Sequence, residues 1–138
     1  MELFSDSERF FELVLRLAEK NNDMSLSKLQ DAYGQDKNVT LNFYMKLLES
    51  KSKFVSMPIA HILCGIGLKD LEKFYELFNL SNSNPEVKVG QIGALKMLSY
   101  KQRIADEAVK KVLAQSESCE RSVRNAAIYF MLLAEIND

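Results

Sequence analysis

The sequence is poor in the residues on which several classes of protein depend. Its 138 residues include no tryptophan, one histidine, two cysteines, two prolines and five glycines. Two cysteines, Cys64 and Cys119, are too few for a disulfide framework, and no Cys-x-x-Cys motif is present. A single histidine leaves a zinc site short of the three or four ligands that it needs. The sequence therefore predicts neither a disulfide scaffold nor a metal site.

No segment carries an excess of one charge, and no long apolar run is present. The 18 basic residues face 19 acidic ones, and residues 1–55, 56–100 and 101–138 are each balanced to within one charge. Nucleic acids and anionic membranes usually require a basic excess, and a membrane span requires about 18 apolar residues. The N-terminus has acids where a signal peptide has basic residues. We therefore expect a cytoplasmic protein that does not bind membranes, and the balanced charge disfavours nucleic acid as a partner.

What the chain does have is a regular spacing of apolar residues. Hydrophobic residues make up 47% and charged residues 27%, which is typical of a globular protein, and the length fits one domain over 1–138. Apolar residues recur every three or four positions, and alternating runs typical of strands are almost absent. We predict an all-α fold, either stacked helical hairpins or a compact multi-helix bundle, with a three-helix part over 1–55 and a second part over 56–138.

Helix start and stop signals divide the chain. Ser5 or Ser7 can cap the first helix, and Asn21 follows its end. Gly65 and Gly67 are expected to end the fourth helix, and SNSNP at 81–85 is the clearest loop. The predicted helices span about 5–21, 25–33, 39–53, 58–67, 68–78, 86–99, 102–115 and 120–136.

Two stretches in the C-terminal half repeat at a spacing of 36 residues. The sequence PEVKVGQIGALKML at 85–98 aligns with RSVRNAAIYFMLLA at 121–134, so that Val87 matches Val123. An amphipathic helix, IADEAVKKVL, separates the two copies. This order predicts a repeated unit of two helices.

The repeat resembles HEAT-type helical repeats over residues 85–136. The first helix of such a repeat often begins with an acid, a valine and a basic residue, as in Glu86-Val87-Lys88 here. Small residues follow, and they would let neighbouring helices approach closely: Gly90, Gly93, Ala94, Ala126 and Ala127. The resemblance implies stacked hairpins and a role in binding a partner protein.

Candidate chemical sites are few and weak. His61 and Cys64 are three residues apart and can share a helical face, but their neighbours are apolar, which favours a structural pair. Gly65-Ile66-Gly67 lacks the third glycine and the preceding strand of a phosphate loop. We therefore predict no catalytic, cofactor-binding or metal-binding residues, and we expect that the protein is not an enzyme.

Residues 25–50 give an alternative function. A short helix, Gly34 and a longer helix resemble a helix-turn-helix motif, although Gln30 stands where a small residue is usual and Thr40 where a buried aliphatic residue is usual. The second helix would offer Asn42, Lys46 and Lys51 to DNA, together with Glu49. The alternative prediction is a DNA-binding regulator built on this segment.

The last predicted helix is apolar on almost every side, as AAIYFMLLA at 126–134 shows. Such a helix should be buried on most sides. In the HEAT-like pattern it is the first helix of a pair, and no second helix follows it in this sequence to cover it. Either the 5–21 helix folds over it, or a partner protein or a second copy of the chain covers it. The second explanation predicts a noncatalytic binding module: an adaptor, an accessory chaperone or an inhibitor. Its partner-binding residues would be Tyr129, Phe130, Leu132 and Leu133.

Overall fold

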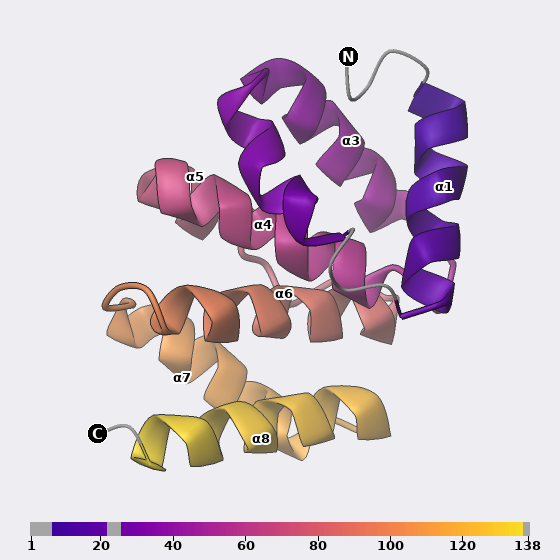
Figure 1. Cartoon of the computed structure of the whole chain (residues 1–138). Coiled ribbons are helices and arrows are strands. Elements are labelled where there is room, and N and C mark those ends of the chain that lie inside the picture. Colours follow the sequence, from indigo (N-terminus) through magenta and orange to yellow (C-terminus); the bar gives the residue numbers. More distant parts are fainter. Residues whose placement is uncertain (1–6, 22–25, 137–138) are drawn as a thin grey trace.

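The computed structural model describes residues 7–21 and 26–136 of the chain (Figure 1). Every regular element in these two ranges is a helix, which confirms the predicted all-α fold. The elements are α1 (Ser7–Glu19), η1 (Ser27–Gly34), α3 (Lys37–Glu49), α4 (Ser56–Lys69), α5 (Leu71–Leu77), α6 (Pro85–Ser99), α7 (Asp106–Ala114), η2 (Gln115–Glu117) and α8 (Arg121–Ile136). None of these helices is long and apolar enough to span a lipid bilayer.

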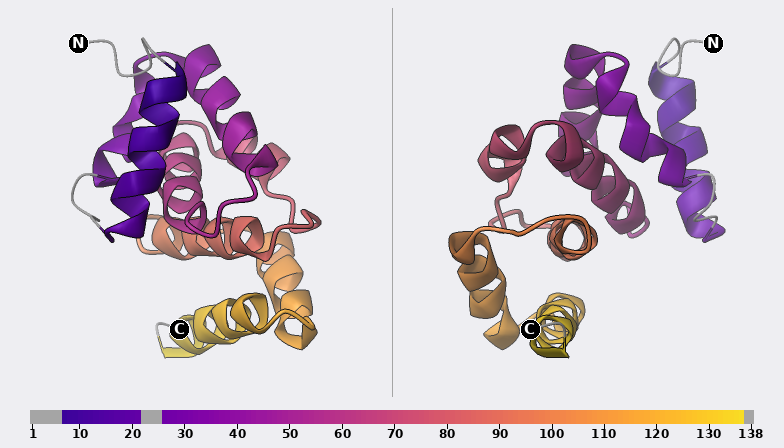
Figure 2. Two further views of the ribbon diagram at one scale, coloured as in Figure 1. Left: turned by 90° about the vertical axis from the view of Figure 1, so that its right-hand side faces the viewer. Right: turned by 60° about the vertical axis from the view of Figure 1, so that its left-hand side comes forward.

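The helices after residue 55 form two rows. α4, α6 and α8 lie one above another and run in the same direction, and α6 packs between the other two (Figure 1). α5 and α7 form a second row beside this stack (Figure 2). α1, η1 and α3 pack on the side of α4 that is turned away from α6 (Figure 1). α4 therefore lies at the centre of the molecule, and α8 forms one end of the stack.

The central position of α4 follows from its sequence, which is apolar on all sides. All seven residues from His61 to Gly67 are buried. Pro58 lies in the first turn, where its missing N–H removes no helical hydrogen bond. The prediction that Gly65 and Gly67 end this helix is wrong, because both lie inside α4 and the helix continues to Lys69.

Gly65 serves a close contact between helices. A Cβ atom at this position would lie 2.2 Å from the backbone carbonyl oxygen of Gln30 in η1. Only a residue without a side chain lets η1 approach α4 so closely. The glycine therefore reflects tertiary packing and not a helix end.

The 36-residue correspondence has a counterpart in the packing. Val87 and Val123 occupy the same place in the first turns of α6 and α8, and both are fully buried. At Gly90 a Cβ atom would lie 2.6 Å from the carbonyl oxygen of Ser56, so α6 and α4 touch through their backbones there. Ala127 is fully buried as well. The predicted role of small residues in close helix packing is confirmed at these positions.

Polar side chains cap the N-terminal ends of α3, α5 and α6, and other local features set several of the remaining helix ends. Asn21 has a φ of 58°, a left-handed conformation that is common just after a helix. The Asp36 carboxylate accepts a hydrogen bond from the Val39 amide and starts α3 two residues earlier than predicted. α7 begins at Asp106 and not at 102, because Ala105 is extended and donates its N–H to the Tyr75 hydroxyl. The predicted cap Ser5 lies outside the described residues.

The asparagine-rich loop before α6 joins the two parts of the chain. Asn82 and Asn84 donate side-chain hydrogen bonds to the carbonyl oxygens of Leu48 and Ser50, at 3.1 and 2.9 Å. These carbonyl groups lie at the C-terminal end of α3, where helical partners are missing. The Asn84 side chain also caps α6 by accepting from the Glu86 amide. The loop thereby fixes α6 relative to α3.

Candidate functional site

α8 packs against the rest of the protein through one side. Val123, Ala127 and Phe130 point inward and are at most 3% exposed. They are spaced four and three residues apart, which places them on one face of a helix. The opposite face is apolar too, and it is open to solvent: Ile128 is 42%, Tyr129 55% and Leu132 53% exposed.

The structure divides the four predicted partner-binding residues. Tyr129 and Leu132 lie on the open face, and Leu133 is half-buried at its edge. Phe130 belongs to the core and does not reach the surface in this structure. The ammonium group of Lys96 lies 5.2 Å from the centre of the Tyr129 ring, which holds this ring at the border with α6.

The 5–21 helix does not cover α8. α1 packs on α3 and α4, with the rings of Phe10 and Phe11 5.1 and 5.7 Å from that of Phe43. It lies on the far side of α6 from α8 (Figures 1 and 2). The open face of α8 is therefore not the place where this helix folds back.

Comparison of α6 with α8 shows how the two helices differ in their surroundings. α6 is covered on two sides, by α4 and by α8, whereas α8 packs against α6, α7 and η2, and within the described part of the chain no helix lies on its far side (Figure 2). Ile92 of α6 and Ile128 of α8 match in the 36-residue repeat, yet Ile92 is 2% exposed and Ile128 42%. The same repeat position is therefore buried in α6, inside the stack, and exposed in α8, at the end of the stack.

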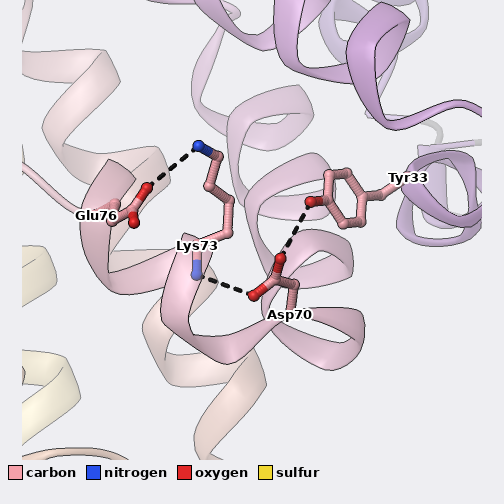
Figure 3. Close-up of polar contacts among 4 residues, drawn as sticks. All are labelled: Tyr33, Asp70, Lys73 and Glu76. Carbon is pink, nitrogen blue, oxygen red and sulfur yellow. Dashed lines mark hydrogen bonds and ion pairs between the residues drawn. The ribbon is translucent and has the colours of Figure 1, made fainter.

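A chain of polar contacts joins η1 to the α4–α5 junction (Figure 3). The Tyr33 hydroxyl donates to the Asp70 carboxylate at 3.4 Å, and this carboxylate also accepts from the Lys73 amide at 3.2 Å and so caps α5. Lys73 pairs with Glu76 at 3.1 Å. Burial, reinforced by Asp70, raises the pKa of the Tyr33 phenol above its ordinary value. The arrangement ties helices together and leaves no reactive group.

His61 and Cys64 lie together in the core. The His61 Nδ1 atom is 3.3 Å from the Gln30 Nε2 atom. Burial raises the pKa of the Cys64 thiol to about 11, although Lys101 opposes the shift. Because the thiolate is the nucleophilic form, Cys64 is an unreactive packing residue at neutral pH. Among the described residues, no group of three or more His, Cys, Asp and Glu side chains is placed to hold a metal ion.

We expect the two thiols to react very differently. Cys119 is exposed and Cys64 is buried. Iodoacetamide at about pH 8 should modify Cys119 quickly and Cys64 only after denaturation, because the Cys64 thiol is both inaccessible and protonated. Mass spectrometry of the wild type and of a Cys119→Ser variant measures this. Modification of native Cys119→Ser at the rate of an open thiol would contradict the packing of α4.

The candidate helix-turn-helix does not present a basic face. Its first element, η1, is a 3₁₀ helix. On α3, Lys37 is the exposed basic residue, beside the exposed Asn42, Met45 and Glu49, while the Lys46 ammonium lies 4.8 Å from the centre of the Phe11 ring. Lys51 is exposed but lies beyond the end of α3. A helix that reads DNA normally carries basic residues on its open side. The geometry therefore gives this alternative no support.

The buried Gln91 was not predicted as a notable residue. It lies in α6 and is 1% exposed, and its Nε2 donates to the Tyr44 hydroxyl at 3.2 Å. In the repeat it corresponds to Ala127, so the alignment places a polar residue where the second copy has a buried small apolar one. This mismatch between the two copies is the sequence feature that could have identified Gln91 in advance.

The fold defines the chain as an all-α protein whose later helices pack in two rows. Comparison with protein-family models gave no match. Comparisons with curated proteins and with solved structures gave no match either.

Proposed function

We propose that this chain is a noncatalytic protein-binding module, and that a helix of a partner protein packs on the open face of α8. This face consists of Ile128, Tyr129 and Leu132, with Leu133 at its edge. The observation that carries the proposal is the one-sided packing of α8. An exposed group of large apolar side chains is costly to leave in water, and large apolar patches mark interaction sites on soluble proteins.

The order of the stack supports a helix as the partner. α6 covers α4, and α8 covers α6, in both cases with the helices running in the same direction (Figure 1). A helix that lay on α8 would continue this order and would bury Ile128 as Ile92 is buried. Exposed polar residues at the start of α8 surround the apolar stripe on one side, as in the rim of many protein interfaces: Arg121, Ser122 and Asn125.

The HEAT-like pattern over 85–136 agrees with this role, because helical repeat proteins bind partners through surfaces of their stacked helices. An adaptor, an accessory chaperone and an inhibitor would all need such a surface. The two free thiols fit a cytoplasmic setting, in which cysteines stay reduced.

The proposal is tested with a Tyr129→Glu/Leu132→Glu variant. Both side chains are more than half exposed, so the melting temperature should stay near that of the wild type. Partner binding should fall at least about tenfold, because two carboxylates would be buried without partners in the interface. Quantitative affinity capture from the native cell extract, with wild type and variant side by side, measures the loss.

A matched control is Leu13→Glu/Leu113→Glu, which changes two leucines of similar exposure, 46% and 47%, on α1 and α7. This variant should capture the same proteins as the wild type. Equal capture by all three proteins would contradict the proposal. Light scattering supplies a second criterion: a wild-type dimer that the α8 variant alone converts to a monomer would show that a second copy occupies the face, and not another protein.

A further inference from the structure

A cavity of about 250 Å³ opens between α3, α5 and α6, away from the face of α8. Met45 and Leu48 of α3 and Leu77 of α5 form its apolar walls. Gln91 of α6 and Glu76 of α5 also line it, and Glu76 is the one charged residue among the lining residues. The cavity therefore combines apolar walls with acceptor groups, of which the Glu76 carboxylate already pairs with Lys73 at 3.1 Å.

Gln91 makes the cavity more than a surface hollow. Its side chain is 1% exposed, and its Nε2 is engaged with the Tyr44 hydroxyl at 3.2 Å. Its Oε1, in contrast, accepts no hydrogen bond from any described residue. A buried acceptor without a partner is destabilising, and a ligand that donates a hydrogen bond to it removes that cost.

The other polar groups of the lining leave this role to Gln91 and Glu76. The Asn82 side chain is held by the Leu48 carbonyl oxygen, and the Asn79 side-chain oxygen accepts from the Ser81 amide and hydroxyl. Glu76 is exposed and lies toward solvent, where its carboxylate pairs with Lys73 at 3.1 Å, whereas Gln91 is buried. Because exposed ion pairs are weak, a second cation can share the Glu76 carboxylate with Lys73 or replace Lys73 there. A ligand that matches the apolar walls, the buried acceptor and the exposed carboxylate has a cationic hydrogen-bond donor and an alkyl stem.

We propose that this cavity binds an alkyl-guanidinium or alkyl-ammonium group, the chemistry of an arginine or lysine side chain. The cation donates to Gln91 Oε1, its charge is balanced by Glu76, and its stem packs on Met45, Leu48 and Leu77. Charge-assisted hydrogen bonds of this kind are the stronger ones. The site is independent of α8, so each proposal can fail without the other.

The test is an NMR titration with butylguanidinium at millimolar concentration, read from the amide resonances of Leu77, Asn79 and Ser81. A capped Gly-Gly-Arg-Gly-Gly peptide is the second probe, and the same peptide with norleucine is the control without donor or charge. Both cationic probes should shift these resonances, and the norleucine peptide should not. Tighter binding of the arginine peptide identifies a protein side chain as the natural ligand, and equal or weaker binding identifies a free small cation.

Variants locate the contacts. Gln91→Met should weaken butylguanidinium binding about tenfold or more, and Glu76→Gln should weaken it about two- to fivefold. Glu72→Gln, an exposed acid on the same helix that does not line the cavity, should bind like the wild type. Tyr44→Phe/Gln91→Met removes the hydroxyl that Gln91→Met leaves unpaired, and it should show the same loss in a well-folded protein. Unmoved resonances, equal shifts with norleucine, or unchanged affinity in both Gln91 variants would overturn the proposal.

Discussion

Replacing Phe130 by alanine should lower the free energy of unfolding by about 3–5 kcal/mol, the usual cost of removing a buried aromatic ring. Phe130 is 3% exposed and packs between α8 and the rest of the core. Ile128→Ala is the matched change on the other side of the same helix, where the side chain is 42% exposed. It should cost less than about 1 kcal/mol, because it removes few buried contacts.

Urea denaturation of the two variants and the wild type measures both values. A large loss for Phe130→Ala and a small one for Ile128→Ala would establish which side of α8 faces the core. Similar losses at the two positions would contradict the packing of α8, and with it the open face on which the proposed function depends.

Gly65→Ala should destabilise the protein by about 1–3 kcal/mol. The added methyl group would lie 2.2 Å from the carbonyl oxygen of Gln30, and a backbone atom cannot move away as a flexible side chain can. The sign of the change in stability is informative, because alanine inside a helix normally stabilises by about 1 kcal/mol relative to glycine. A net destabilisation would show that the steric clash costs more than the gain in helix propensity.

Gly93→Ala is the control for this prediction. Its Cβ atom would lie 3.4 Å from the Cβ atom of Ala60, an ordinary contact. The variant should be as stable as the wild type or more stable by up to about 1 kcal/mol. Thermal and urea unfolding of both variants decide the matter. If Gly65→Ala were stabilised like Gly93→Ala, the close approach of η1 and α4 would be wrong.

Local signals were sufficient for the fold class and for most helices. Apolar spacing predicted the all-α fold, and the polar loop before Pro85 was placed correctly because its residues favour turns. Gly65 was misread because a glycine near a helix end and a glycine at a helix contact look alike in sequence. The difference lies in η1, which is more than 30 residues away along the chain.

The candidate site, like the fold, was predicted only as far as local sequence allows. The apolar run of α8 predicted an unusual surface, and Tyr129 and Leu132 lie on it. Phe130 was grouped with them because a helix that is apolar all round does not reveal which side its neighbours cover. Spacing from the buried Val123 would have assigned it inward, since Val123, Ala127 and Phe130 share one face.

The most direct test of the proposed binding role places a photo-crosslinking residue at position 132 or, as a control, at position 113 of the intact protein in its own cells. Both leucines are about half exposed, at 53% and 47%, on α8 and α7. The account predicts a discrete adduct with another protein from position 132 and none from position 113. Equal crosslinking from both positions, or an adduct of twice the mass of the chain, would contradict a partner protein on α8.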